Sequence, residues 1–432
     1  MKKLKKLQSL LKEIENELAK CTHCGLCQSV CPVYGETRHE GDVARGKLAL
    51  LGGLGGELIS DAGNVRKRLE KCLLCGSCMA HCPAGVPSME IFLKARAALA
   101  EYEGLSGASK LIFRLGLVHP GFFNGITALG AKFQNYMIRE ADAYYGTSCA
   151  PMLEAVLGNR HFVPLAKTPF HREVPFLDTP SGASGLTVAF FPGCLTDKVY
   201  PRLGKAALKI FKHHGIGVFM PENQVCCGMP ALASGDLSSF EKLVERNLQC
   251  FSGKKFDFLL TPCATCTATF KKVWPMMAES LGLKQGDAMG RFSEKIMDIQ
   301  DFLVRHVNLE KGISEEGLSV TIHDPCHLFR SLGVFSSQRS LVSSSGRYRV
   351  QEMKDSTSCC GAGGSFTLKH YETSAALGEK KRENILSSGA SMVATGCPAC
   401  MMQLTDALSR SGDRIPVAHS IELYAESLGK SL

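Results

Sequence analysis

The chain has 432 residues, 45% of them hydrophobic and 21% charged, with a net charge of +9. This composition excludes a disordered chain, and the length suits two or three domains at about 150 residues each. No run reaches the roughly 18 to 20 apolar residues of a membrane-spanning helix. Lysine and arginine are spread along the whole chain, so we expect no nucleic-acid partner.

Twenty cysteines are unusual in a chain whose start does not resemble a secretion signal. The first residues are basic, but Glu13 stands where the apolar region of a signal peptide should lie. We therefore expect a cytoplasmic protein with reduced thiols. In that setting cysteines indicate metal binding rather than disulfides.

The first segment predicts an amphipathic helix, because leucine and isoleucine recur at spacings of three and four from Leu4 to Leu18. Its leading lysines would suit an acidic partner subunit or lipid head groups, as would the net charge. Two interpretations stay open. The preferred one is a capping helix and an ordinary solvated basic surface; the other is peripheral association with the inner face of the cell membrane.

A Cys-x-x-Cys-x-x-Cys-x-x-x-Cys-Pro run follows, and it occurs twice. This is the spacing of bacterial two-cluster ferredoxins, in which the fourth cysteine of each run serves the other cluster. Two structural zinc sites are the alternative, but zinc explains neither the third cysteine step nor the Cys-Pro ending. We predict two 4Fe–4S clusters, the first held by Cys21, Cys24, Cys27 and Cys82, the second by Cys72, Cys75, Cys78 and Cys31.

The residues between and after these runs read as helices joined by loops. The glycine-rich stretch 51–64 is expected to be a loop, without the glycine order of a nucleotide site. Residues 106–185 read as a helical segment and a strap. Within them, the uncharged stretch Leu115 to Ala131 is expected to be buried or interfacial, because Pro120 and three glycines interrupt it.

From about residue 186, short β-like runs alternate with helical stretches, which is typical of an α/β fold. The pattern then recurs, which indicates an internal repeat. The expected strands lie in LTVAFFPG, FDFLLTP, LSVTIHDPC, YRVQEM and ASMVATGCPAC.

Each copy of the repeat carries five cysteines, and equivalent cysteines are 132, 133 or 134 residues apart. Neighbouring side chains in extended backbone point apart, so an adjacent cysteine pair suits two irons or a larger assembly. A zinc site or a reduced structural thiol cluster is the alternative. The first set is Cys194, Cys226, Cys227, Cys263 and Cys266; the second is Cys326, Cys359, Cys360, Cys397 and Cys400.

Two cysteines and four histidines lie outside these sets. Cys149 and Cys250 fit neither set, and Cys250 reads as plain core. The histidines near the repeats are His213, His214, His323 and His327, and His327 follows Cys326 directly. A histidine beside a cluster can tune its potential by hydrogen bonding, but a satisfied structural histidine is the favoured interpretation for all four.

The motifs FFPGC…CCG…C-x-x-C and HDPC…CCG…C-x-x-C resemble the CCG domains of heterodisulfide reductase catalytic subunits. The whole order, a two-cluster ferredoxin, a strap and two CCG domains, is similar to the iron–sulfur subunits of glycolate and D-lactate oxidases. The resemblance implies a multidomain fold, with an α-helical ferredoxin domain followed by a duplicated α/β CCG region. It also implies one or two further iron–sulfur clusters of noncubane type at the CCG motifs.

We therefore expect four parts: residues 1–105, 106–185, 186–316 and 317–432. The resemblance implies the electron-transfer subunit of a flavin-dependent glycolate or D-lactate dehydrogenase. Such a subunit does not oxidise the hydroxyacid itself. It would receive electrons from an FAD-containing partner subunit and pass them to a quinone or another redox carrier.

Three other functions stay open. A heterodisulfide reductase-type subunit would reduce a disulfide at a CCG-bound cluster. The iron–sulfur subunit of an anaerobic glycerol-3-phosphate dehydrogenase shares the same domains. A purely structural metal-binding scaffold would carry no electrons. No catalytic residue is assigned from the sequence.

Overall fold

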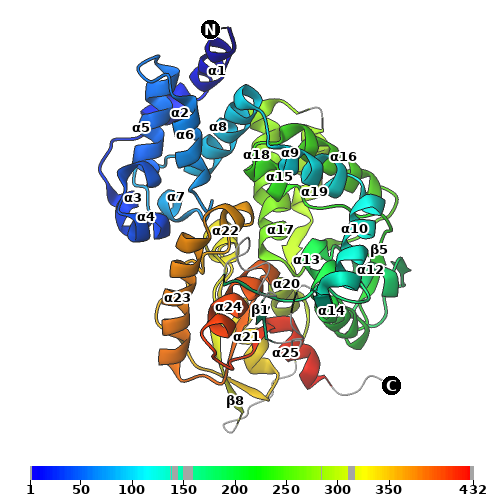
Figure 1. Cartoon of the computed structure of the whole chain (residues 1–432). Coiled ribbons are helices and arrows are strands. Elements are labelled where there is room, and N and C mark those ends of the chain that lie inside the picture. The colour runs from blue at the N-terminus through cyan, green and yellow to red at the C-terminus, as the bar shows by residue number, and fades with distance from the viewer. Residues whose placement is uncertain are drawn as a thin grey trace. The chain divides into compact units, whose positions relative to one another are not determined.

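The computed structural model describes residues 2–136, 138, 145–148, 159–283, 285–309 and 317–428. It divides into two compact units. Unit 1 consists of Met1–Val118, Gly228–Lys242 and Gly361–Leu377; unit 2 consists of His119–Cys227, Leu243–Cys360 and Gly378–Leu432. Figure 1 colours the chain by residue number, so the three pieces of unit 1 appear in blue, green and orange. The four-part division expected from the sequence stays a prediction.

Unit 1 is made of helices. They are α1 (Lys2–Lys12), α2 (Glu15–Ala19), α3 (Leu26–Val30), α4 (Pro32–Thr37), η1 (Glu40–Asp42), α5 (Ala44–Gly55), α6 (Ala62–Glu70), α7 (Ser77–Ala80), α8 (Ser88–Glu103), α9 (Gly107–Lys110), the π-helix η2 (Leu111–Leu117), α15 (Met229–Ala233) and α22 (Ser365–Lys369). The segment predicted as one amphipathic helix forms α1 and α2. Its buried Leu7 and Leu11 face the rest of the unit, and α1 packs on α5 and α8 as a cap.

The glycine-rich stretch 51–64, which was predicted to be a loop, is partly helical. Helix α5 continues to Gly55, because Leu51 and Leu54 are fully buried and their packing outweighs the low helix propensity of glycine.

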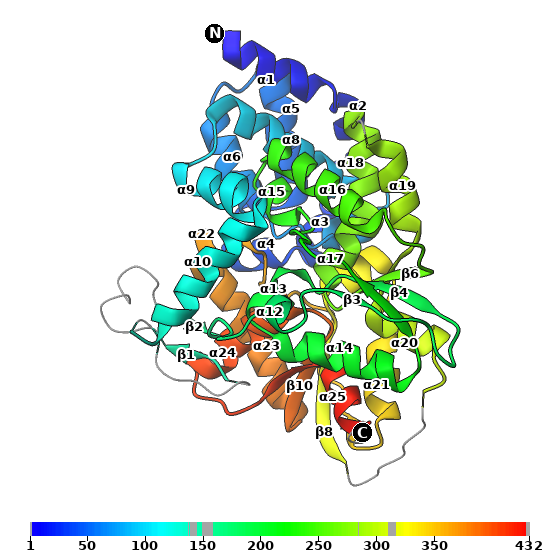
Figure 2. The same cartoon turned by 90° about the vertical axis from the view of Figure 1, so that its right-hand side faces the viewer.

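The two later pieces of unit 1 pack against its first piece. Helix α15 contacts α8, as Figure 2 shows, and Arg96 of α8 donates a hydrogen bond of 2.7 Å to the carbonyl of Ala233. Lys369 of α22 forms an ion pair with Glu70 of α6 at 3.0 Å. Unit 1 is therefore completed by segments that lie far away in the sequence.

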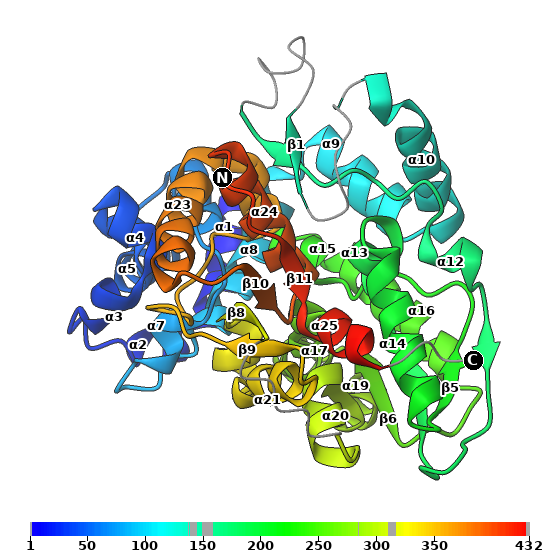
Figure 3. The ribbon, with the colours of Figure 1, turned by 90° about the horizontal axis from the view of Figure 1, so that it is seen from below.

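Unit 2 contains two large β-sheets. The first has the strand order β3 (Leu177–Asp178), β5 (Gly217–Met220), β4 (Thr187–Phe190), β6 (Phe258–Thr261) and β7 (Ile296–Asp298). The second has the order β11 (Val417–His419), β10 (Met392–Thr395), β8 (Leu318–His323) and β9 (Tyr348–Val350), and Figure 3 shows it from below. A short pair, β1 (Thr147–Ser148) with β2 (His161–Phe162), lies apart from both.

The two large sheets repeat one topology. Strands β5, β4, β6 and β7 of the first sheet correspond to β9, β8, β10 and β11 of the second, and all of these pairings are parallel. Only β3, from the strap, joins antiparallel, at the edge of the first sheet. The predicted fold class is therefore confirmed: a helical ferredoxin part followed by a duplicated α/β region.

The helices of unit 2 connect and cover these strands. They are α10 (Pro120–Phe133), η3 (Gln134–Tyr136), α12 (Phe170–Glu173), α13 (Gly193–Lys198), α14 (Pro201–His213), α17 (Ala264–Ala268), the π-helix η4 (Thr269–Val273), α18 (Trp274–Leu281), α19 (Gly286–Glu294), α20 (Ile299–His306), the π-helix η5 (His327–Ser331), α21 (Ser336–Ser344), α24 (Pro398–Arg410) and α25 (Ser420–Ser427). Helices α16 (Leu237–Phe251) and α23 (Tyr371–Ser388) begin in unit 1 and end in unit 2. Within the described residues, every helix is too short or too polar to cross a bilayer.

Candidate iron–sulfur sites

The two ferredoxin-type loops share one backbone design. His23 and Leu74, each just before the second cysteine of its run, have φ of 56° and 52°. Gly25 and Gly76, each just after that cysteine, have φ of 85° and 73° and begin the short helices α3 and α7. Alternating left-handed residues curl each loop around a common centre, and glycine adopts this conformation without a steric penalty.

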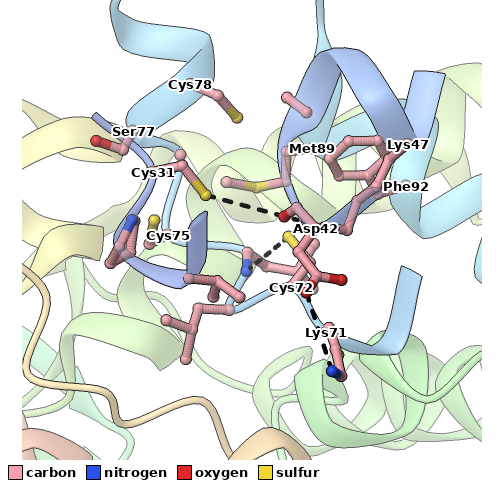
Figure 4. A pocket seen from close by; sticks show the side chains of 16 residues that line it. Cys31, Asp42, Lys47, Lys71, Cys72, Cys75, Ser77, Cys78, Met89 and Phe92 are labelled. Carbon is pink, nitrogen blue, oxygen red and sulfur yellow. Dashed lines mark hydrogen bonds and ion pairs between the residues drawn. The ribbon is translucent and has the colours of Figure 1, made fainter. Parts of the chain in front are cut away.

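Four of the predicted ligands line one pocket. Cys31 lies in the first run, and Cys72, Cys75 and Cys78 lie in the second, yet all four border the same cavity in unit 1. Figure 4 shows their sulfur atoms around this pocket. Asp42, Met89 and Phe92 complete part of its wall. Four soft sulfur donors in one enclosed site are a donor set that fits an iron–sulfur cluster.

The other predicted cubane ligands are placed less fully. Cys27 lies close enough to Cys21 for their charges to interact, and Cys24 is exposed. Cys82 is half-buried on the turn that follows α7. Its place in the first set stays a prediction, as does the complete ligand set of each cluster.

Backbone amides point at several of these sulfurs. The amide of Leu74 donates to the Sγ of Cys72 at 3.4 Å, and the amide of Tyr34 donates to the Sγ of Cys31 at 3.5 Å. The amide of Arg45 makes a similar contact with Cys27. Such bonds stabilise the thiolate form of a cysteine. They also raise the reduction potential of a cluster that this cysteine holds.

Burial acts on the same thiols in the opposite sense. It raises the pKa of Cys78 to about 12, with the neighbouring Cys72 as the second cause. Burial also raises the pKa of Cys31. These side chains therefore hold their protons until a metal displaces them, which couples cluster assembly to proton release.

Two buried cations, neither of them predicted from the sequence, border the second cubane site. The Nζ of Lys47 donates to the carbonyl of Asp42, and Lys47 interacts with the charges of Cys72 and Cys31. Arg96 is buried and donates to the carbonyls of Leu69 at 2.6 Å and Cys72 at 2.8 Å. A cationic wall compensates the negative charge that four thiolates bring to the site.

One signal could have found Lys47. It stands three residues after Ala44 and four before Leu51, on the apolar face of a predicted helix where a lysine is unusual. No comparable sequence signal marks Arg96, because its partners are backbone carbonyls distant in the chain.

The five cysteines of the first CCG set come together in unit 2. Cys194 and Cys263 follow β4 and β6, at the carboxyl edge of the sheet where α/β folds place their sites. Thiol contacts link Cys194 to Cys226, Cys226 to Cys227, Cys227 to Cys266, and Cys266 to Cys263. This linked group is one dense thiol cluster.

The second CCG set has the same placement, with Cys326 and Cys397 after β8 and β10. Thiol contacts link Cys397 to Cys400 and Cys400 to Cys360, while Cys359 is buried. A ring nitrogen of His323 and the sulfurs of Cys360 and Cys400 lie within 4.8 Å of one another. The second set thus contains a nitrogen donor as well as sulfur.

Lys381 is a buried cation beside the second set. Its Nζ donates to the carbonyls of Asp355 at 2.5 Å and Ser356 at 3.3 Å. Burial lowers its pKa to about 8, while the nearby charges of Cys360 and Cys359 oppose that shift. This cation was not predicted from the sequence.

The two CCG sets meet each other within unit 2. The thiol of Cys263 contacts the thiol of Cys397. The Oγ1 of Thr265 lies 3.8 Å from the Sγ of Cys397 and 3.1 Å from the Nδ1 of His327. Nothing in the spacing of the cysteines indicates this contact.

The remaining two cysteines lie outside these groups. Cys250 is half-buried rather than core, and its Sγ donates to the carbonyls of Glu222 at 3.7 Å and Asn223 at 3.6 Å. Burial raises its pKa. Cys149 lies outside the described residues.

Comparison with known families agrees with the geometry. Residues 17–86 match a 4Fe–4S dicluster domain, and residues 188–271 and 320–405 each match the cysteine-rich CCG domain. These matches include both cubane runs and both CCG sets. The strap between them lies outside the matched residues.

Three relatives of known name show how far the similarity extends. The chain is 26% identical to a probable glycolate oxidase iron-sulfur subunit of Bacillus subtilis, over 99% of this chain and 98% of that protein. It is 27% identical to lactate utilization protein A of Bacillus subtilis, over 55% of this chain and 98% of that protein. It is 35% identical to a fumarate reductase (CoM/CoB) subunit of Methanothermobacter marburgensis, over 55% of this chain but only 45% of that protein. The resemblance inferred from the motifs is confirmed.

Proposed function

We propose that this chain, which belongs to the iron–sulfur proteins that join a 4Fe–4S dicluster domain to two CCG domains, is the electron-transfer subunit of a flavin-dependent 2-hydroxyacid dehydrogenase of the glycolate or D-lactate type. The meeting of Cys31, Cys72, Cys75 and Cys78 around one pocket carries the electron-transfer part of the proposal. The full-length similarity to a glycolate oxidase iron-sulfur subunit supports the hydroxyacid part.

The ligand assignments are part of this proposal. Cys21, Cys24, Cys27 and Cys82 would hold one cubane cluster, and Cys72, Cys75, Cys78 and Cys31 the other. The CCG sets would hold one or two further clusters. Such clusters accept and release single electrons. Lys47, Arg96 and the amides aimed at the sulfurs would stabilise the added negative charge.

The oxidation itself would take place on a partner subunit. Oxidation of a 2-hydroxyacid to a 2-oxoacid releases two electrons and two protons, and FAD on the partner would accept them together. This chain would then draw the electrons away singly and deliver them to a quinone or another redox carrier. A chain whose sequence lacks a flavin or nicotinamide fingerprint depends on such a partner.

The exposed face of α10 supports a peripheral membrane location. This helix has no buried residue, and Phe122, Ile126, Leu129 and Phe133 recur along one face with 44 to 58% of their surface exposed. The stretch from Leu115 to Ala131 was expected to be buried or interfacial. For α10, burial is therefore wrong. Between Gly104 and Tyr136 the chain has lysine and arginine but no acidic residue. An apolar stripe in a cationic segment suits the inner, anionic face of a cell membrane.

A disulfide reductase is the second candidate function. The observation that favours it is the contact between Cys263 and Cys397, which brings two complete CCG sets together. One relative that matches part of the chain is named as a fumarate reductase (CoM/CoB) subunit, so a reductase function is represented among the relatives. In that function the CCG region would reduce a substrate rather than relay electrons.

Anaerobic affinity purification of the full chain from its own cells tests the proposal. We expect a flavoprotein to copurify, and glycolate or D-lactate to bleach the iron–sulfur absorption of the complex. The chain alone should not respond to either acid. A Cys72→Ser variant should slow the bleaching, whereas Cys250→Ser, which changes a cysteine outside both groups, should not. Turnover of a thiol disulfide without any flavoprotein would overturn the hydroxyacid assignment.

A further inference from the structure

The two CCG repeats carry different kinds of ring at the third position before their first cysteine. Phe191 stands three residues before Cys194, and His323 stands three residues before Cys326. Both side chains are buried. Phe191 packs edge-to-face on Phe270, with ring centroids 4.8 Å apart. The first repeat therefore fills this position with an apolar ring, and the second fills it with a metal-binding ring.

The backbone holds His323 firmly in place. It is the last residue of β8, and it lies opposite Thr395 of the parallel strand β10. The next residue, Asp324, bonds through its amide to the carbonyl of Ser356 at 3.1 Å and through its carboxylate to Arg339 at 2.8 Å. The imidazole therefore sits at the carboxyl edge of the sheet, where the second set of cysteines gathers.

One nitrogen of the His323 ring is buried without a hydrogen-bond partner. Only 1% of the residue is exposed, and the nitrogen without a partner is Nδ1. Native proteins seldom leave such an atom without a partner, because nothing then replaces the hydrogen bonds that it made to water. A structural histidine would be expected to engage this nitrogen.

A metal would supply such a partner. Donors bound to one tetrahedral ion lie about 3.6 to 3.8 Å apart, for metal–nitrogen and metal–sulfur bonds of about 2.1 and 2.3 Å. A ring nitrogen of His323 and the sulfurs of Cys360 and Cys400 all lie within 4.8 Å of one another. An inward movement of at most about 1 Å would therefore bring the three donors onto a single ion.

We propose that His323 is a metal ligand of the second CCG site, which is therefore a mixed nitrogen and sulfur site, whereas the first is built from thiolates alone. A neutral imidazole brings less negative charge to iron than a thiolate and raises its reduction potential, as histidine ligands do in Rieske centres. The second site is then the stronger electron acceptor of the two. This inference rests on the proposed iron at the CCG cysteines.

The test uses the full chain, labelled with 15N-histidine, purified anaerobically and trapped in a paramagnetic state. Pulsed EPR should detect a strongly coupled histidine nitrogen on a signal that is not a cubane signal. The coupling should disappear in His323→Phe, which copies the residue of the first repeat. It should persist in His327→Phe, the matched control, whose ring follows Cys326 but already bonds Thr265.

Two further measurements keep the outcomes distinct. His323→Cys, which keeps a ligand but adds negative charge, should retain iron and lower the potential of the second site. Two cubanes hold about eight iron atoms. If the chain contains more iron than this but shows no histidine coupling, the role of His323 is overturned and the CCG clusters stand. A chain with no metal beyond the cubanes would overturn both this inference and the proposed CCG clusters.

Discussion

The thiol of Cys263 contacts the thiol of Cys397, although the two cysteines belong to different copies of the repeat. Both stand at equivalent positions, each just after a central strand of its sheet. Because this contact joins the two sets, a substitution in one CCG set should also change the properties of the other.

Cys263→Ser should therefore alter the spectroscopic signal of both CCG sites. Cys194→Ser, whose thiol contacts Cys226 of its own set, should alter the first site alone. Mössbauer spectra of iron-57 protein, with the cubane signals as an internal reference, would separate the two patterns. A second-site signal that is unchanged in Cys263→Ser would show that the sets act independently.

Cys31→Ser should damage the cubane whose other ligands are Cys72, Cys75 and Cys78. The reason is that Cys31 lines their pocket, about 40 residues before the first of them in the sequence. EPR of the reduced protein should show one cubane signal lost or converted to a three-iron form. Loss of the signal that depends on Cys21 and Cys27 instead would refute the crossed arrangement. Cys250→Ser serves as the cysteine control.

Lys47→Met should lower the reduction potential of the same cubane. Removing a buried cation beside Cys31 and Cys72 disfavours the added electron. We expect a shift on the order of one tenfold change in the redox equilibrium, about 59 mV for a one-electron step. Lys71→Met is the matched control, because Lys71 lines the same pocket but is partly exposed, where water screens its charge. A redox titration with equal shifts in both variants would contradict this role of Lys47.

How far the sequence alone leads can be seen from particular elements. The runs LTVAFFPG, FDFLLTP and LSVTIHDPC contain strands β4, β6 and β8 as predicted, because parallel strands buried on both faces are continuously apolar. The repeat spacing likewise predicts the duplicated sheets. Local patterns and regular spacing were sufficient here.

Other features depend on contacts between distant segments. The helical course of Leu51 to Gly55 follows from burial that no local pattern reveals. The thiol contact between Cys263 and Cys397, and the carbonyls that hold Arg96, are equally long-range. Such features arise from tertiary packing, which overrides propensity and which one sequence does not encode visibly.

The buried carboxyl of Asp298 should make stability depend on pH. Its Oδ1 accepts bonds from the amides of Gln300 at 2.9 Å and Asp301 at 3.3 Å, and its Oδ2 is buried without a partner. Burial raises the pKa of Asp298 to about 7, above its unfolded value of about 3.9. Between these values the native chain binds more protons than the unfolded one. The free energy of unfolding therefore falls as pH rises toward 7 and is level above it.

Asp298→Asn removes this dependence and keeps a residue that caps helices well. As pH rises from 5 to 8, the free energy of unfolding of the variant should increase by roughly 1–3 kcal/mol relative to that of the wild type. This magnitude follows from about 1.36 kcal/mol per pKa unit, reduced because the protein relaxes around the charge. Anaerobic thermal unfolding at several pH values measures it. Asp61→Asn is the control, since Asp61 caps α6 and its pKa is lowered by the amide of Asn64. A constant difference between Asp298→Asn and wild type across this range would refute the assignment.

The exposed face of α10 should mediate binding to anionic vesicles. Phe122→Ser combined with Leu129→Ser should reduce cosedimentation with vesicles rich in phosphatidylserine by about tenfold or more, because two large apolar side chains leave the interface. Leu58→Ser, at a leucine that is 86% exposed elsewhere in the chain, should have no effect. Binding of the wild type should also weaken at high salt. Equal binding by all three proteins would argue against a membrane role for this helix.

Unit 1 is assembled from three stretches of chain, and two of them begin immediately after a cysteine pair, at Gly228 and Gly361. A protease that nicks the backbone once between residues 119 and 227 therefore leaves part of unit 1 on each product. The contacts of Arg96 with Ala233 and of Lys369 with Glu70 then join the two products. The nicked protein should elute as a single species until it is denatured, and neither fragment, expressed by itself, should reproduce a complete unit 1.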